Sequence, residues 1–419
     1  MNKFIIAAVA GMLLAACSGG DGSQTATGTV DIAAAMKNPG ELTTSQLGSK
    51  ISFVPLETND SALIGGKWTL RVAGDKVVIS NIGQVVVKDE NVGVNVFDIN
   101  TGRYVSSPGR SGQGPEDRAN GFIWTNKNGD KIYSRAGNGK GFVVYTTDGK
   151  FAGKMPEGPE FSYFFTDSDT TMTLLKNDTG DSSRELVLYT YGQSGTLLDS
   201  CVLFSGQADE PVRRNFSGEL LTIITYDDSG FPLTQQSLTE LKTPSTSTII
   251  PDIPANQLGD EMHISQTMCD TIYRISAQGA EPVVIFDFGD NGFPFGEFNK
   301  RLPKSNEMYM TQALETPFKM LFAFSEGWLG DKSHKEYIGI YDRKSGKTIV
   351  ANAEKGIRDD LGGFMPFNPV TTTADGKWIG MLTMEQIDEW LDENPEVNRP
   401  DWLANSTAED NPVLVIISD

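Results

Sequence analysis

Residues 97–104 read Phe97-Asp98-Ile99-Asn100-Thr101-Gly102-Arg103-Tyr104 and decide the fold class, because the same pattern recurs along the chain. An apolar strand end is followed by a polar turn that contains a glycine, and then by the start of a second strand. Glycine adopts positive φ at no steric cost, so it suits the turn of a β-hairpin. Equivalent turns end at Gly149, Gly195, Gly279 and Gly346.

The spacing of these glycines predicts a β-propeller. Gly102 and Gly149 are 47 residues apart, and Gly149 and Gly195 are 46 apart. The next interval, 84 residues to Gly279, is interpreted as two units, and the last, 67 residues to Gly346, as one unit plus an insertion. A period of about 40–50 residues with four short strands per unit is typical of propeller blades. The glycine turn would then join the third and fourth strands of a blade. A β-sandwich or β-solenoid with coincident turns is the alternative.

The rest of the chain has the same texture. Runs of four to six residues, rich in β-branched and aromatic side chains, are separated by Gly, Asn and Asp, and helix-period segments are nearly absent. Such runs predict strands and an all-β class. Examples are residues 76–80, 94–98, 131–133, 141–145, 186–189, 271–275, 283–286, 336–341 and 413–417.

The two ends of the mature chain predict how the ring closes. Residues 51–56 form an early strand and residues 412–418 a strand at the chain end. Pairing of these N- and C-terminal strands in one blade would close the ring and remove its free edges.

Two insertions are expected. Thr383 and Gln386 have the spacing of a capping box, so a helix should begin there and end near Asn394, before Pro395. One face of this helix is apolar, which favours packing on the propeller flank, with a partner-binding helix as the alternative. Residues 290–318 contain three prolines and are expected to form a second insertion, near the mouth of the central channel.

The N-terminus has the pattern of a lipoprotein. Residues 1–16 form a signal peptide with an apolar stretch too short to span a bilayer. Small residues precede Cys17, which would carry the lipid. A flexible tether is expected over residues 17–41, since its first part is rich in Gly, Ser and Thr, and the propeller over residues 42–419.

Composition excludes several function classes. The formal net charge is −20 without a basic cluster, which argues against nucleic-acid binding. The chain has only two histidines, so a His-rich zinc site or a Ser-His-Asp triad is not expected. An exported protein can form a disulfide between Cys201 and Cys269, although cysteines in strands more often behave as small buried hydrophobes.

At several places the chain resembles the six-bladed β-propeller lipoproteins, NHL-like propellers of polysaccharide-degrading Gram-negative bacteria. The resemblance extends from about Leu42 to the end of the chain. It rests on four motifs: Leu56-Glu57-Thr58 with Leu63-Ile64-Gly65, Gly109 to Glu116, Thr271-Ile272-Tyr273 with Asp287-Phe288-Gly289, and Asn411-Pro412-Val413-Leu414-Val415.

The resemblance implies six blades and an export route, but no established activity. Members look like accessory proteins near polysaccharide-uptake systems, which is an analogy of fold and context. Where the family has a pattern such as Gly-Pro-Gly-Glu-Tyr, this chain has Gly114-Pro115-Glu116-Asp117-Arg118, which puts a family role for that turn in doubt.

The candidate binding site is the loop from Arg110 to Arg118. In a propeller, a loop between blades lies on the face where ligands usually bind. Arg110, Gln113 and Glu116 would present hydrogen-bonding groups there, and Trp124 an aromatic platform for a sugar. The alternative is that the glycines only fix a tight blade connection and that Trp124 belongs to the core.

Other chemistry is weakly supported. The glycine-rich loops lack the Lys-Ser/Thr ending of a P-loop. Adjacent carboxylates are mostly solvated turn residues, and no catalytic residue, cofactor or metal ligand is expected. Asp167-Ser168-Asp169 begins like a calcium loop, which leaves a structural calcium open.

The sequence therefore predicts a lipid-anchored binding or interaction module in the cell envelope, accessory to glycan capture or uptake, on either face of the outer membrane. Its partners would be the membrane and a glycan or a transport-complex protein. The alternatives are a propeller-type glycoside hydrolase or polysaccharide lyase, and a scaffold that binds only protein.

Overall fold

The computed structural model describes residues 28–65, 68–81, 93–126, 128–139, 141–155, 163–167, 171–179, 183–192, 195–207, 214–218, 222–226, 232–237, 241–247, 255–259, 261–265, 268–294, 303–328 and 332–419. Cys17 and the signal peptide lie outside these ranges. Within them, no helix is long and apolar enough to span a membrane.

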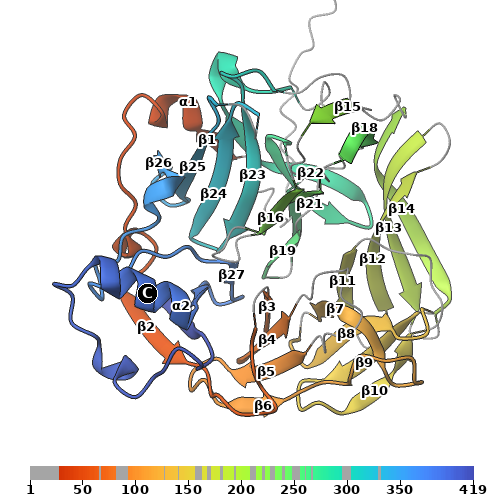
Figure 1. Ribbon diagram of the computed structural model, residues 1–419. Helices are drawn as coiled ribbons and strands as arrows, with labels where there is room; N and C mark the ends of the chain where they lie inside the picture. The colour runs from red at the N-terminus through yellow and green to blue at the C-terminus, as the bar shows by residue number, and fades with distance from the viewer. Residues whose placement is uncertain are drawn as a thin grey trace, which may run out of the picture.

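The chain folds into a six-bladed β-propeller, as predicted (Figure 1). The strands of each blade run from the innermost, near the ring axis, to the outermost. The first blade consists of β3 (Trp68–Ala73), β4 (Lys76–Asn81), β5 (Val94–Asp98) and β6 (Tyr104–Ser106), and the second of β7 (Arg118–Thr125), β8 (Lys131–Ala136), β9 (Phe142–Thr146) and β10 (Phe151–Met155). The third consists of β11 (Tyr163–Asp167), β12 (Thr171–Thr179), β13 (Ser183–Gly192) and β14 (Leu197–Gln207), and the fourth of β19 (Ala255–Leu258), β20 (Glu261–Ser265), β21 (Thr271–Ser276) and β22 (Gly279–Asp287). The fifth consists of β23 (Met308–Glu315), β24 (Lys319–Glu326), β25 (Lys335–Asp342) and β26 (Lys347–Asn352), and the sixth of β27 (Thr371–Thr372), β28 (Trp378–Leu382), β29 (Val413–Ser418) and β2 (Lys50–Pro55).

All five glycine turns join the third and fourth strands of a blade, as their spacing predicts. Each glycine has a positive φ, between 70° at Gly102 and 124° at Gly279. In the first blade the Asp98 carboxylate accepts hydrogen bonds from the backbone of Asn100 and Thr101 and from the Thr101 hydroxyl. These bonds lower the pKa of Asp98, and the bond from the Thr101 hydroxyl has the largest effect.

The prediction that the 84-residue interval holds two blades is wrong. It holds one blade and an inserted segment of four strands, β15 (Arg214–Gly218), β16 (Thr222–Tyr226), β17 (Pro232–Ser237) and β18 (Leu241–Ser247). β15 pairs with β18 and β16 with β17, and neither pair joins a blade. The insertion happens to be as long as a blade, so spacing alone cannot distinguish the two.

The predicted ring closure is confirmed. β2 pairs antiparallel with β29, from Lys50 opposite Ser418 to Pro55 opposite Val413. The strand β2 is thus the outermost strand of the last blade, and its hydrogen-bonded pairing with β29 closes the ring.

The ordered chain begins earlier than the predicted tether allows. β1 (Gly28–Asp31) adds a fifth, parallel strand to the outer edge of β22, and Val30 and Ile32 are fully buried. Helix α1 (Ile32–Ala35) follows, and the Gly40 amide donates to the Val350 carbonyl of β26 at 2.8 Å. Residues 28–49 therefore form a strap along the outside of the fourth, fifth and sixth blades, and the tether prediction over residues 17–41 is wrong from residue 28 onward.

The C-terminal helix is confirmed and the second insertion is partly wrong. α2 (Met384–Glu393) begins with the predicted capping box between Thr383 and Gln386. Met384 and Ile387 are buried on the propeller flank. Within residues 290–318, however, Met308–Glu315 forms β23, the innermost strand of the fifth blade. Seven of its eight side chains are buried and only Thr311 is partly exposed, which fits a strand packed between blades better than an irregular insertion.

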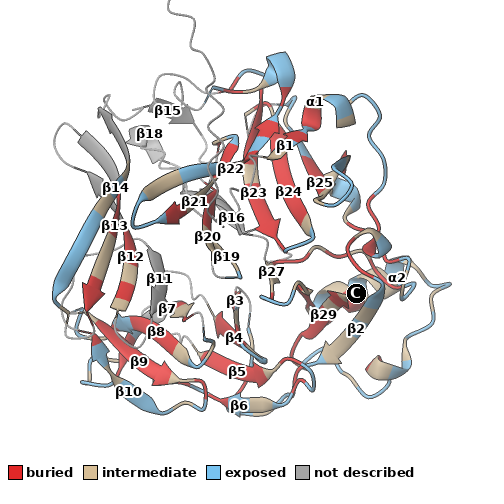
Figure 2. Ribbon diagram, turned by 180° about the vertical axis from the view of Figure 1, so that it is seen from behind, coloured by how far each residue is buried: buried red, intermediate tan, exposed pale blue. Residues whose placement is uncertain are grey.

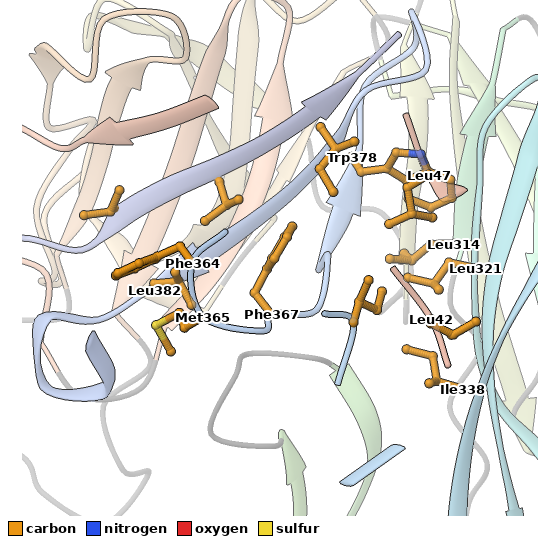
Figure 3. Close-up of a cluster of buried hydrophobic side chains, with 14 of the residues drawn as sticks. Leu42, Leu47, Leu314, Leu321, Ile338, Phe364, Met365, Phe367, Trp378 and Leu382 are labelled. Atoms are coloured by element: carbon orange, nitrogen blue, oxygen red, sulfur yellow. The ribbon is translucent and has the colours of Figure 1, made fainter. Parts of the chain in front are cut away.

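The core lies between the blades, and exposed residues collect on outer strands such as β10 and β14 (Figure 2). Its largest cluster joins the fifth blade, the sixth blade and α2 around Trp378 (Figure 3). Cys201 and Cys269 are both free thiols that pack as partly buried side chains, so the disulfide alternative is not realised.

Candidate functional site

The loop from Arg110 to Arg118 connects β6 to β7 and so joins the first two blades. Successive strands of a blade alternate in direction. Connections between blades therefore emerge at the same end of the ring as the connections between second and third strands, which include α2 in the sixth blade. The loop from Arg110 to Arg118 thus lies at the end of the ring that carries the connections between blades, as the sequence predicts.

Asp117 is the centre of this loop. Its carboxylate accepts one hydrogen bond from Arg110 Nε at 3.0 Å and another from the Gly114 amide at 2.7 Å. The bond from Arg110, followed by that from Gly114, lowers the pKa of Asp117. A Cβ on Gly112 or Gly114 would collide with the Asp117 side chain. The glycines therefore permit a closed carboxylate clamp that fixes the loop conformation.

A second anchor ties the loop to the core of the second blade. Arg118 is buried, which lowers its pKa to about 10, and its Nε donates to the Pro108 carbonyl at 3.3 Å. The Tyr145 hydroxyl, on β9, donates to the Glu116 carbonyl. Burial raises the pKa of Tyr145 to about 12, so this phenol stays neutral at physiological pH.

The structure brings three of the four predicted site residues together. Gln113 and Glu116 are exposed on the loop, and the Arg110 side chain is 81% exposed although it binds Asp117. Trp124 is not part of this group. Trp124 lies near the far end of β7 from Arg118, where it pairs with Tyr133 on β8. Its half-buried ring packs against the ring of Phe142, with 5.9 Å between the ring centroids.

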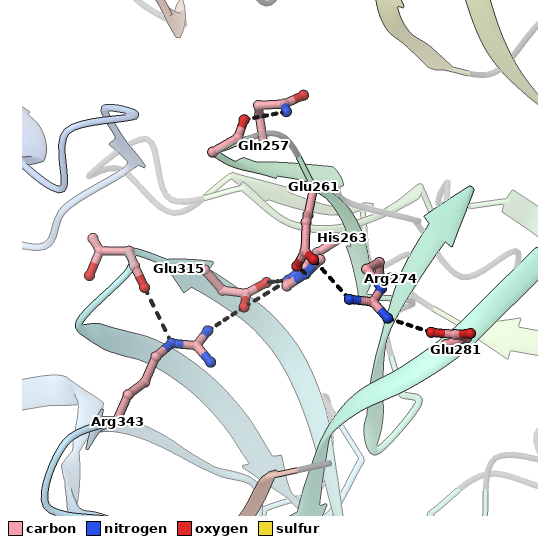
Figure 4. Close-up of polar contacts among 9 residues, drawn as sticks. Gln257, Glu261, His263, Arg274, Glu281, Glu315 and Arg343 are labelled. Atoms are coloured by element: carbon pink, nitrogen blue, oxygen red, sulfur yellow. Dashed lines mark hydrogen bonds and ion pairs between the residues drawn. The ribbon is translucent and has the colours of Figure 1, made fainter. Parts of the chain in front are cut away.

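A charged network that sequence reasoning did not find lies between the fourth and fifth blades (Figure 4). Glu315, at the end of β23, has a side chain that is 0% exposed. His263 Nδ1 lies 3.1 Å from both of its carboxylate oxygens, and the Arg343 guanidinium binds the same carboxylate. No sequence motif announces this network, because its members come from two blades and Glu315 falls in the segment expected to be irregular.

The network continues outward through alternating charges. His263 Nε2 lies 3.4 Å from Glu261, which accepts a hydrogen bond from Arg274 at 2.8 Å. Arg274 in turn binds Glu281 on β22. With His263 protonated, each charge in the series is flanked by charges of opposite sign. Burial lowers the pKa of His263, but its bonds to Glu315 and Glu261 outweigh that effect and raise the pKa above its usual value.

This raised pKa predicts a pH-dependent stability. A histidine whose pKa is higher in the folded than in the unfolded chain stabilises the fold below about pH 6.5 and loses that contribution as pH rises through the folded-state pKa. We expect the free energy of unfolding to fall as pH rises from about 6.5 through the higher folded-state pKa of His263, measured by denaturant titration. His263→Gln should flatten this slope, whereas His334→Gln should retain it. An unchanged slope in His263→Gln would contradict the prediction.

The two histidines and the acidic residues of the described part of the chain were the remaining candidates for a metal site. His334 bonds the Gly327 carbonyl at 3.0 Å through Nδ1, and both histidines are largely buried. No group of His, Cys, Asp and Glu among the described residues has an arrangement that would hold a metal ion. The hypothesis of a calcium at residues 167–169 falls outside the side chains that the structure describes.

Fold and closure define the class: a six-bladed β-propeller whose N-terminal strand completes the last blade. The chain belongs to the family described as "Domain of unknown function (DUF4934)", whose sequence profile matches residues 27–418.

Two solved structures are similar. A putative exported protein from Bacteroides fragilis has a TM-score of 0.59 and 16% identity, covering 90% of this chain and 97% of its own. A DUF4221-family member from Bacteroides vulgatus has a TM-score of 0.39 and 8% identity, covering 91% and 98%. At 16% identity the likeness to the Bacteroides fragilis protein concerns the fold alone. No functionally curated protein matches the sequence.

Proposed function

We propose that this protein is a lipid-anchored binding module of the outer membrane that captures a glycan and passes it to an uptake system. The likeness to an exported Bacteroides protein supports a location outside the cytoplasm. The small residues before Cys17 support attachment of a lipid at that thiol. The segment between Cys17 and Gly28, where the first strand begins, can span at most about 40 Å, at roughly 3.6 Å per residue.

The observation that carries the proposal is the clamped loop between the first two blades. The Asp117 clamp and the Tyr145 bond fix its backbone, yet Arg110, Gln113 and Glu116 reach solvent. A fixed loop loses little conformational entropy on binding. Its guanidinium, amide and carboxylate groups offer both donors and acceptors, which is the chemistry that recognises sugar hydroxyls.

A binding module is favoured over the hydrolase or lyase alternative because the described titratable groups with shifted pKa values serve the fold. Asp117 closes a loop, and His263 joins two blades. A glycosidase would need two accessible carboxyl groups about 5–10 Å apart across a sugar. The described residues of the loop supply Glu116 alone, since Asp117 is buried in its clamp.

The test is a thermal-shift screen against a broad glycan panel, with analysis of products in the same samples. A ligand at 100 times its Kd should stabilise the protein by about 2.7 kcal/mol. A shift without products supports the binding module, and products support the enzyme. No shift and no products would overturn glycan binding and favour a protein partner. In cells, Cys17→Ser should release the protein from the membrane fraction.

We expect Arg110→Gln to weaken glycan binding about tenfold, since one charge-assisted hydrogen bond to the ligand would be lost. Lys150→Gln is the matched control. Its side chain is 80% exposed, it also pairs with an aspartate, and it lies in the turn between β9 and β10 at the other end of the ring. Isothermal titration with the best ligand of the panel measures both variants. Equal effects of the two substitutions would exclude the loop as the site.

A further inference from the structure

Arg71 lies on the inner wall of the ring. It is the fourth residue of β3, the innermost strand of the first blade, which lies near the centre of the ring (Figure 1). β3 contacts β27 of the sixth blade and β7 of the second. The Thr125 hydroxyl on β7 donates to the Val72 carbonyl at 3.0 Å, so neighbouring blades flank Arg71 closely.

The residues around Arg71 are in the core, but Arg71 is exposed. Leu70 and Val72 pack in the cluster shared with the sixth blade, and Ala73 packs in the cluster shared with the second blade. With both flanks of β3 occupied by other blades, solvent reaches the middle of this strand from the ring axis. The Arg71 side chain therefore opens onto the centre of the propeller.

Arg71 has no hydrogen bond or ion pair with any residue that the structure describes. Since no described carboxylate pairs with Arg71, its solvated guanidinium can exchange water for an anionic ligand without breaking an ion pair to the described residues.

The other described side chains of the innermost strands that reach solvent carry no charge. Their hydroxyl and amide groups belong to Thr69, Thr125, Thr311, Thr371, Thr372, Asn256 and Gln257. Glu315 and Arg118, the charged members, are buried. Among the side chains that the structure describes, the inner wall thus combines a planar guanidinium, which can bind a carboxylate through two parallel hydrogen bonds, with groups suited to sugar hydroxyls.

We propose that Arg71 makes the inner wall of the ring a binding site for the carboxylate of an acidic saccharide. The inference rests on the proposed glycan-binding function and names its ligand class. A sulfate ester presents a similar charge and shares this chemistry.

The experiment measures binding by isothermal titration with the full mature protein and matched probes: tetragalacturonate, its methyl ester, neutral galactotetraose and a sulfated galactotetraose. We expect tetragalacturonate to bind and its ester to bind at least tenfold more weakly. Arg71→Gln should weaken tetragalacturonate binding by tenfold to a hundredfold, and Arg71→Lys should restore part of it, which a merely structural role would not predict. Arg103→Gln, an exposed arginine in the outer turn of the same blade, should bind as the parent does.

The possible outcomes distinguish failure of the Arg71 site from failure of glycan binding. Equal affinity for acid and ester, or an unchanged affinity in Arg71→Gln, would overturn the Arg71 site and leave glycan binding standing. Binding of the sulfated probe alone, lost in Arg71→Gln, would overturn the carboxylate and retain an anion site. No binding of any of the four probes would overturn the acidic-saccharide class, and only failure of the wider glycan panel would overturn the proposed function.

Discussion

Glu315→Gln is expected to lower the free energy of unfolding by about 3 kcal/mol, because it removes one partner from a buried charge cluster. The Glu315 side chain is fully buried and accepts bonds from His263 of the fourth blade and Arg343 of the fifth. Without its charge, the buried His263 and the partly exposed Arg343 would both face a neutral amide. The loss should appear in chemical denaturation as a lower midpoint with an unchanged m-value.

Glu281→Gln is the control for this substitution. Glu281 belongs to the same series of charges, but its side chain is 68% exposed, so solvent screens its pairing with Arg274. Its removal should change the free energy of unfolding by about 0.5 kcal/mol or less. Equal losses for Glu281→Gln and Glu315→Gln would show that burial does not decide the contribution of the network.

The fold was predictable where one local feature dictates geometry. Five glycines, each with positive φ, predicted the turns between the third and fourth strands, and two apolar terminal strands predicted the closure. The number of six blades came from the family resemblance. Prediction failed where two different structures are compatible with the same segment length or composition. The inserted strands from residue 214 to 247 have the extent of a blade, and β1 buries Val30 and Ile32 directly after a stretch with the composition of a linker.

The candidate site was predictable in the same limited way. The loop, its face and the exposure of Arg110, Gln113 and Glu116 follow from chain order and turn chemistry. The role of Asp117 was not predictable, because a buried carboxylate that bonds the loop and a solvated carboxylate in a turn have the same sequence pattern. Trp124 could not be placed either, since an aromatic residue on an innermost strand can face the core or the solvent, and here it packs against Phe142.

Gly102→Ala is expected to destabilise the protein by about 2–5 kcal/mol, from two separate causes. A positive φ of 70° costs an alanine about 1–2 kcal/mol. The new Cβ would also collide with the Pro55 carbonyl at the end of β2, and overpacking of a fitted contact costs about 1–3 kcal/mol more. The turn of the first blade would thus push against the strand that closes the ring. Denaturant titration of both proteins measures the difference.

Gly346→Ala separates the two causes. Gly346 occupies the same turn in the fifth blade with the same φ of 70°, but its Cβ would meet nothing within 4 Å. It should therefore lose only the backbone contribution of about 1–2 kcal/mol. The excess loss in Gly102→Ala then measures how firmly β2 is held against the first blade. If the two variants lose the same stability, the closing strand yields without cost, and the ring is fastened by the core between blades rather than by the fit of β2 at this turn.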